Sequence, residues 1–224
     1  MEYWIQKYEG KEALWIHDGL PARPHALLTS GRHSSGFFNS ELITEDPLIL
    51  DEACEHLAFL IQKEANVHAI DRVVGPAMGA ITVAHDLARQ IGNKRGHSCL
   101  RAYAEKELDI FGNVRGMRFI RTAIQPGDYI LLCEDVITTG TSIGLTACAV
   151  TDAGGIVLPY VIALINRSGH AMIDGKEIIA LINREMPVWE ADVCPLCAKG
   201  SEAIRPKGTE NWARLTAEMD GGAN

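Results

Sequence analysis

The sequence predicts an α/β protein with a mainly parallel sheet flanked by helices, and a small cap built from both ends of the chain. Between residues 67 and 185, apolar β-branched runs alternate with helical patterns, which is the order expected of a parallel sheet. Residues 1–66 and 186–224 lack that alternation. We therefore assign residues 1–66 to a cap segment that includes the first core helix, residues 67–185 to the α/β core, and residues 186–224 to a second cap segment and tail.

Length and composition indicate an ordinary globular chain. Its 224 residues, 47% hydrophobic and 22% charged, can bury roughly 70% of the unfolded surface without a metal or disulfide staple. No apolar run approaches the roughly 18 residues that span a bilayer, and the first ten residues lack a signal-peptide core. The net charge of −8 disfavours nucleic acid and anionic membranes as partners. We expect a cytoplasmic protein whose six cysteines form no disulfides.

The first cap segment begins with an irregular helical pattern and ends with a clear one. Apolar residues cluster unevenly over residues 4–16, before glycine and two prolines break the chain at residues 19–24. Residues 51–65 place apolar side chains at helical spacing behind two acids, which suit a helix start. This last stretch is the predicted first helix of the core.

The core segment alternates strands and helices. We expect strands at residues 67–74, 98–104, 117–124, 129–133, 156–165 and 178–182. A helix is expected at residues 81–91, and a second helix ends at Ala153, where two glycines stop it. The strand at 129–133 is almost uninterruptedly apolar, as in strands buried on both faces of a parallel sheet. Residues 105–116 form a charged, glycine-punctuated loop.

The strongest chemical signal follows the strand at 129–133. Two acids, Glu134 and Asp135, stand where it ends, at the sheet edge where ligands of open α/β folds bind. The loop behind them holds one glycine among four hydroxyl residues: Thr138, Thr139, Gly140, Thr141 and Ser142. Backbone N–H groups and hydroxyls at a helix start favour a phosphate, whereas the acids suit sugar hydroxyls or a Mg²⁺ that carries phosphates. A helix N-cap, the plainer interpretation, requires only one such side chain.

Residues 130–142 resemble the phosphoribosyl-pyrophosphate (PRPP) motif of type I phosphoribosyltransferases. That motif reads four apolar residues, two acids, two apolar residues, Thr-Thr-Gly, any residue, and Ser or Thr, and every position is met. The resemblance implies that Glu134 and Asp135 hold the ribose hydroxyls while residues 138–142 wrap the 5-phosphate. Beside this motif, Ala77, Met78 and Gly79 resemble the family's pyrophosphate loop, with simple chain reversal as the alternative.

Three further positions resemble orotate phosphoribosyltransferases, in a form found in a bacterial subgroup. Phe37 and Phe38 follow a Ser-Gly-Arg-x-Ser segment like that family's, which implies that both rings face the base. Lys106 matches a lysine on a mobile loop that closes over the neighbouring subunit's site. Arg167 matches an arginine that contacts the orotate carboxylate. Each position also has a plainer interpretation. Phe37 and Phe38 can belong to a core strand after a solvated loop, Lys106 to a charged surface loop, and Arg167 can be an exposed arginine at a strand end.

Two features need separate interpretation. Thr29 stands where the orotate family often has a lysine that contacts pyrophosphate. Cys194 and Cys197 have the spacing of half a zinc site, but a structural site takes four ligands. The eight histidines form no spaced ligand pair, so we interpret the cysteine pair as a turn in the cap and metal binding as the lesser alternative. The Cys-Pro-Leu-Cys tail resembles the carboxyl end of the bacterial subgroup.

The resemblance implies an orotate phosphoribosyltransferase that converts PRPP and orotate to orotidine 5′-monophosphate and pyrophosphate. Mg²⁺ is the implied cofactor, held through PRPP with Asp135 as a candidate ligand. Lys106 and Asp135 are the implied catalytic residues, and the Lys106 loop implies a homodimer with sites shared across the interface. Two alternatives stay open: a purine phosphoribosyltransferase, and a regulator of the same fold that binds a nucleotide or RNA.

Overall fold

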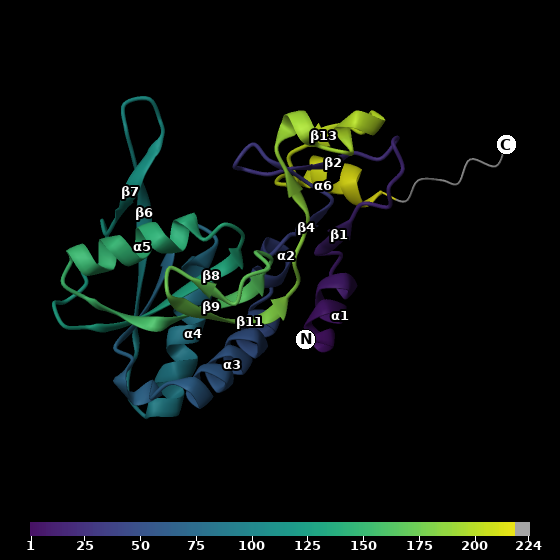
Figure 1. Ribbon diagram of the computed structural model, residues 1–224. Coiled ribbons are helices and arrows are strands. Elements are labelled where there is room, and N and C mark those ends of the chain that lie inside the picture. The colour runs from purple at the N-terminus through teal and green to yellow at the C-terminus, as the bar shows by residue number, and fades with distance from the viewer. Residues whose placement is uncertain (218–224) are drawn as a thin grey trace. The chain divides into compact units, whose positions relative to one another are not determined.

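The computed structural model describes residues 1–217, which divide into two compact units (Figure 1). The larger one comprises Thr44–Arg184, and we call it the core unit. The smaller one joins Met1–Ile43 to the described residues from Glu185 onward, and we call it the cap unit. No helix among the described residues is both long and apolar enough to cross a membrane.

The core unit is built on a seven-stranded sheet in the order β10-β11-β9-β8-β5-β6-β7 (Figure 1). Its strands are β5 (Arg72–Pro76), β6 (Leu100–Leu108), β7 (Val114–Arg118), β8 (Tyr129–Ile137), β9 (Ile156–Asn166), β10 (Met172–Ile173) and β11 (Lys176–Asn183). The central strands run parallel, whereas β7 and β10 pair antiparallel at the two edges. The predicted mainly parallel sheet is therefore confirmed.

Helices cover both faces of this sheet. α3 (Pro47–Glu64) and α4 (Ala80–Arg95) lie together on one face, and α5 (Thr141–Asp152) lies on the other (Figure 1). Ile143 and Val150 of α5 share a buried apolar cluster with Ile130 and Leu132 of β8. Leu131, between those two strand residues, is also fully buried. Burial of successive β8 side chains explains why its sequence is uninterruptedly apolar.

Two core elements begin elsewhere than the sequence pattern indicates. α3 begins at Pro47, ahead of the expected residues 51–65, because the Asp46 side chain caps the first turn and proline suits it. The strand expected at 67–74 begins only at Arg72, because Asn66 caps a short 3₁₀ helix, η1 (Val67–Ala69). In both places a side-chain oxygen that accepts backbone N–H bonds decides where the element starts.

The segment 105–116 is a β-hairpin rather than the expected loop. β6 and β7 both extend into it, so the second strand begins at Val114 and overlaps only residues 117–118 of the strand expected at 117–124. The Asp109 carboxylate accepts hydrogen bonds from the backbone N–H groups of Phe111 and Asn113, and these bonds close the turn. Its charged side chains belong to an edge hairpin, which solvates them without a loop.

The cap unit combines short elements from both ends of the chain. They are α1 (Glu2–Gly10), β1 (Leu14–Ile16), β2 (His25–Leu27), β3 (His33–Ser34), β4 (Gly36–Phe38), β12 (Val188–Trp189), η2 (Ala191–Val193), η3 (Cys197–Lys199), β13 (Ala203–Ile204) and α6 (Thr209–Thr216). The short helix α2 (Glu41–Thr44) spans the boundary between the units along the chain. β1 pairs with β4, and a second sheet runs in the order β12-β3-β2-β13. In this second sheet, two adjacent strands from the N-terminal segment, β3 and β2, are flanked by β12 and β13 from the C-terminal segment.

Candidate functional site

Two acids stand near the carboxyl end of β8, the middle strand of the core-unit sheet. Glu134 is 8% exposed, and one of its carboxylate oxygens accepts a hydrogen bond of 3.3 Å from the backbone N–H of Asp135. Burial, reinforced by the negative charge of Asp135, raises the pKa of Glu134 well above its usual range. A hydroxyl donor or a cation bound beside it would favour the ionised form. The two acids are therefore chemically suited to bind a ligand that offers hydroxyl groups or positive charge.

The hydroxyl loop, residues 138–142, turns from β8 into α5. Gly140 has φ of +76°, and a Cβ atom there would lie 1.5 Å from the Cδ1 atom of Ile173, so both backbone and space require glycine. The hydroxyl oxygens of Thr139 and Thr141 lie 3.0 Å apart on the exposed side of the turn. Together with the backbone N–H groups at the start of α5, they form a cradle suited to a phosphate.

The predicted pyrophosphate loop, residues 77–79, leads from β5 into α4. β5 is the hydrogen-bonded neighbour of β8, which brings this loop beside the acids. A Cβ atom at Gly79 would lie only 2.7 Å from an Asp135 carboxylate oxygen, so that carboxylate rests against the glycine backbone. The Ala77–Met78 peptide is cis, and the Met78 side chain is 82% exposed. The structure thus brings the acids and this loop together at one sheet edge.

Lys106 lies in β6 rather than on a loop, paired opposite Met117 of β7. Its side chain is exposed. The positive charge of Lys106 is among the effects that lower the pKa of Glu134, although burial outweighs it. The charge of Lys106 is therefore felt by Glu134 of its own chain.

Arg167 follows β9, the other hydrogen-bonded neighbour of β8, and its backbone N–H donates to the carbonyl of Ile137. Arg167 is only 3% exposed, and burial lowers the pKa of its guanidinium to about 10. The group remains charged at neutral pH, and a desolvated cation of this kind favours a bound anion. Asn166 supports the turn that follows, because it donates to the His170 carbonyl and accepts from the Ser168 backbone N–H. Sequence reasoning did not identify this role of Asn166.

The two adjacent aromatic rings belong to the cap unit. Phe38 is 2% exposed and packs edge-on against Tyr8, with ring centroids 5.4 Å apart. Phe37 is half-buried, with its ring centroid 5.9 Å from that of Trp212. Thr29 is exposed in the turn between β2 and β3. The structure gives both rings packing partners within the cap, and their contact with a base stays a prediction.

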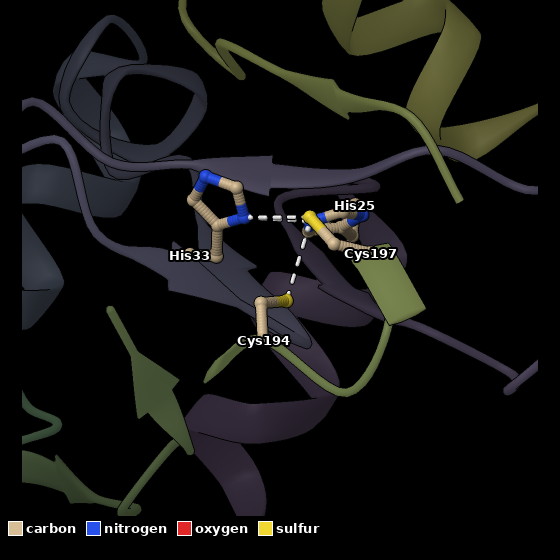
Figure 2. A group of neighbouring side chains, drawn as sticks. All are labelled: His25, His33, Cys194 and Cys197. Atoms are coloured by element: carbon tan, nitrogen blue, oxygen red, sulfur yellow. Dashed lines mark hydrogen bonds between the residues drawn. The ribbon is translucent and has the colours of Figure 1, made fainter. Parts of the chain in front are cut away.

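The expectation that Cys194 and Cys197 lack a second ligand pair is wrong. His25 and His33 place ring nitrogens beside the two sulfurs, and one ligand atom from each residue lies within 4.8 Å of all the others (Figure 2). The histidines stand on β2 and β3, so a hairpin rather than a regular spacing brings them together. Burial, followed by the charges of His33 and His17, lowers the pKa of His25 to about 4.

Comparison with known proteins gives close relatives, although no protein-family model matches the chain. The orotate phosphoribosyltransferase of Heliobacterium modesticaldum is 35% identical over 185 residues, which cover 81% of this chain and 88% of the relative. That of Pelotomaculum thermopropionicum is 34% identical over 194 residues, covering 87% and 94%. That of Caldicellulosiruptor saccharolyticus is 31% identical over 205 residues, covering 92% and 95%.

Solved structures share the fold at lower identity. The orotate phosphoribosyltransferase of Aeropyrum pernix superposes with a TM-score of 0.56 at 18% identity, covering 80% of this chain and 92% of that one. The enzyme of the same name from Francisella tularensis gives 0.55 at 20% identity, covering 81% and 85%. An adenine phosphoribosyltransferase from Thermoanaerobacter pseudethanolicus gives 0.52 at 20% identity, covering 66% and 88%. The fold is thus shared by enzymes named for different bases.

Proposed function

Because the chain belongs to the orotate phosphoribosyltransferase family, we propose that it transfers the 5-phosphoribosyl group from PRPP to orotate, a step of pyrimidine biosynthesis. The products are orotidine 5′-monophosphate and pyrophosphate. The proposal rests on one observation: the Asp135 carboxylate lies against the backbone of Gly79, beside the hydroxyl loop. A purine acceptor is the weaker candidate, because the three relatives compared above, each more than 30% identical to this chain, are named for orotate.

The reaction exchanges one bond at C1′ of the ribose. The bond to the pyrophosphate oxygen breaks as a ring nitrogen of orotate bonds to C1′, through an oxocarbenium-like state, and the proton of that nitrogen is released to the departing pyrophosphate or to water. Glu134 and Asp135 hold the ribose hydroxyls, the hydroxyl loop wraps the 5-phosphate, and the backbone of residues 77–79 receives the pyrophosphate. Catalysis then rests on positioning and on charge stabilisation, so no residue acts as a covalent nucleophile.

Mg²⁺ is the cofactor in this proposal, held through PRPP. The donor set fits, because carboxylate oxygens suit a hard divalent cation and Asp135 presents its carboxylate beside the proposed pyrophosphate loop. When bound, Mg²⁺ supplies positive charge to the departing pyrophosphate. Lys106 supplies further positive charge from the exposed hairpin of β6 and β7.

Orotate differs from other pyrimidine bases by its carboxylate, and Arg167 is the proposed partner for that group. A guanidinium can pair with a carboxylate through two parallel hydrogen bonds, and burial of Arg167 strengthens such a pair. Phe37 and Phe38 are the proposed base-facing rings of the cap unit. Phe37 is the more accessible of the two, whereas Phe38 requires movement of its ring away from Tyr8.

A C₂ homodimer completes the proposal, with the Lys106 hairpin of one protomer acting in its partner's site. The exposure of Lys106 and the position of its hairpin at the sheet edge support this role. The proposal also assigns the protein to the cytoplasm, a compartment that keeps cysteine thiols reduced.

Asp135→Asn tests the carrying observation. Loss of the charge weakens hydrogen bonds to the ribose hydroxyls that are worth roughly 1.5–3 kcal/mol, so kcat/KM for PRPP falls about tenfold or more. Asp152→Asn, an exposed acid at the end of α5, is the matched control and keeps wild-type kinetics. Full activity in the Asp135→Asn variant would show that the motif at residues 130–142 does not bind PRPP.

A further inference from the structure

We propose that His25, His33, Cys194 and Cys197 form a structural zinc site in the cap unit. The four side chains come from opposite ends of the chain, yet their ligand atoms all lie within 4.8 Å of one another (Figure 2). Three of the four residues are buried, and Cys197 is half-buried. Two sulfurs and two imidazole nitrogens at one point form the donor set that selects zinc among common metals.

Four of the six distances between ligand atoms in the cluster are close to those of a tetrahedral zinc complex. With Zn–S of about 2.3 Å and Zn–N of about 2.0–2.1 Å, a sulfur and a nitrogen lie about 3.5 Å apart, and two nitrogens about 3.3 Å. The His25 Nε2 atom lies 3.6 Å from the Cys194 sulfur and 3.5 Å from the Cys197 sulfur. The Cys197 sulfur lies 3.2 Å from His33 Nδ1, and the two nitrogens are 3.0 Å apart.

Hydrogen bonding alone does not account for this convergence. Three partners surround His25 Nε2, which offers a neutral imidazole's single lone pair or single proton. At most one of them can be well satisfied in a direct hydrogen bond. A cation at the centre instead accepts one lone pair from each of the four ligand atoms, so all four are satisfied together.

The outer surroundings of His25 fix the orientation that a metal needs. The Ser201 hydroxyl lies 2.8 Å from His25 Nδ1, and it donates its own proton to the Arg23 carbonyl at 2.5 Å. The serine oxygen must therefore accept from the His25 Nδ1–H group. This assignment leaves the lone pair on Nε2, the atom that faces the other three ligands. Metal-binding histidines are commonly oriented in this way by a second hydrogen bond.

The cysteine pair sits on a turn that holds both sulfurs on one side. The Ala198 N–H donates to the Cys194 carbonyl at 3.1 Å, and the Gly200 N–H donates to the Cys197 carbonyl at 2.9 Å. Gly200 has φ of +88°, a conformation that glycine adopts without strain. The turn is therefore formed by backbone hydrogen bonds, which fix the chain path between the two cysteines.

The function of this site is to join the two ends of the chain. His25 opens β2, which pairs with β13 from the C-terminal segment, and Cys194 lies 169 residues further along the chain. Four protein ligands leave no open position for a substrate, and two thiolates balance the charge of a divalent cation. The metal therefore serves the stability of the small cap unit, whose formation its binding favours.

Metal content of the full-length protein tests the proposal directly. The protein, purified with reductant and dialysed against Zn²⁺ and then buffer, holds about one zinc per chain by mass spectrometry. Cys194→Ser and Cys197→Ser lose it, whereas Cys148→Ser, a change at an exposed cysteine of α5, retains it. Wild-type protein that holds no zinc, or cysteine variants that keep it, would overturn the site. A Cys194–Cys197 disulfide that persists in the metal-free protein in the presence of reductant would overturn it as well.

Two measurements keep the test sharp if a cysteine variant fails to fold. Co²⁺ added to metal-depleted wild-type protein gives the absorption of a tetrahedral complex with thiolate-to-metal charge transfer; an octahedral spectrum without thiolate bands contradicts the assignment. Ser201→Ala keeps all four ligands but removes the partner of His25 Nδ1, so zinc affinity falls roughly 10–100-fold. An unchanged affinity in that variant would exclude the proposed orientation of His25.

Discussion

Glu134 lowers the stability of the folded protein and at the same time is suited to bind a ligand. Its carboxyl group is buried next to a second acid, and burial raises its pKa well above the usual range. Ionisation therefore costs free energy in the empty protein, and a ligand that donates hydrogen bonds to the carboxylate recovers some of that cost. The PRPP motif has an acid at this position, although a neutral side chain would make the folded protein more stable.

Glu134→Gln is expected to stabilise the ligand-free protein at neutral pH while weakening the use of PRPP. The folded-state pKa of Glu134 lies above its unfolded value, so its contribution to stability is fully present below the unfolded value and is lost as pH rises through the folded one. The Tm advantage of the variant should therefore grow from acidic to neutral pH. Thermal melts across that range measure it, and an advantage that shrinks as pH rises would contradict the assignment.

Arg167 sets the proposed preference for a carboxylated base. In Arg167→Ala, KM for orotate should rise about tenfold or more, because charge-assisted hydrogen bonds are worth roughly 1.5–3 kcal/mol, while PRPP binding changes little. Arg101→Ala, at an exposed position near the start of β6, is the control for removal of an arginine. Equal binding of orotate and uracil by the wild-type protein would contradict the role of Arg167.

At the scale of elements, the sequence predicts best what depends on local pattern. The strand–helix alternation and the motif at residues 130–142 are readable, because strands buried on both faces are continuously apolar and the motif is contiguous. The hairpin at 105–116 cannot be predicted in this way. Its charged residues are typical of a solvated loop, and Asp109 closes the turn by accepting hydrogen bonds from backbone N–H groups. The metal-site ligands are hidden for another reason: His25 and Cys194 meet only after strands from both chain ends pair.

Gly79 tests how two elements position one acid. Gly79→Ala is expected to lower kcat/KM for PRPP about tenfold or more. The added methyl carbon would lie only 2.7 Å from an Asp135 carboxylate oxygen, so the carboxylate would have to move. The fold should survive, since φ of −55° at Gly79 suits alanine. Gly96→Ala is the complementary control. Alanine is strained at the φ of +75° found there, so this variant loses about 1 kcal/mol of stability, but its methyl group contacts no neighbouring residue. Wild-type kinetics in Gly79→Ala would contradict the placement of Asp135.

At the scale of the whole molecule, a mixing experiment identifies the protomer whose Lys106 serves a given site. Lys106 lowers the pKa of Glu134 in its own chain, whereas the proposed dimer assigns it to the partner's site. Mixing Lys106→Ala protomers with Asp135→Asn protomers separates the two arrangements. If Lys106 acts across the interface, each mixed dimer has one site with both defects and one with neither. Activity should then rise toward about one wild-type site per mixed dimer.

Subunit exchange is the control for that experiment, and native mass spectrometry of the mixture measures it. If mixed dimers form and activity stays at the level of the separate variants, Lys106 acts within its own chain. A protein that is monomeric at assay concentration would exclude the shared site altogether. Far-UV circular dichroism of Lys106→Ala should match the wild type, because the side chain is exposed.

The most direct test of the proposed reaction is product formation from PRPP and Mg²⁺ with each of five bases: orotate, uracil, adenine, hypoxanthine and xanthine. Orotate should give orotidine 5′-monophosphate and an equal amount of pyrophosphate, and the other four bases should give little or no nucleotide. Nucleotide formation from a purine in preference to orotate, or no product with any base in the folded, zinc-loaded protein, would contradict the account.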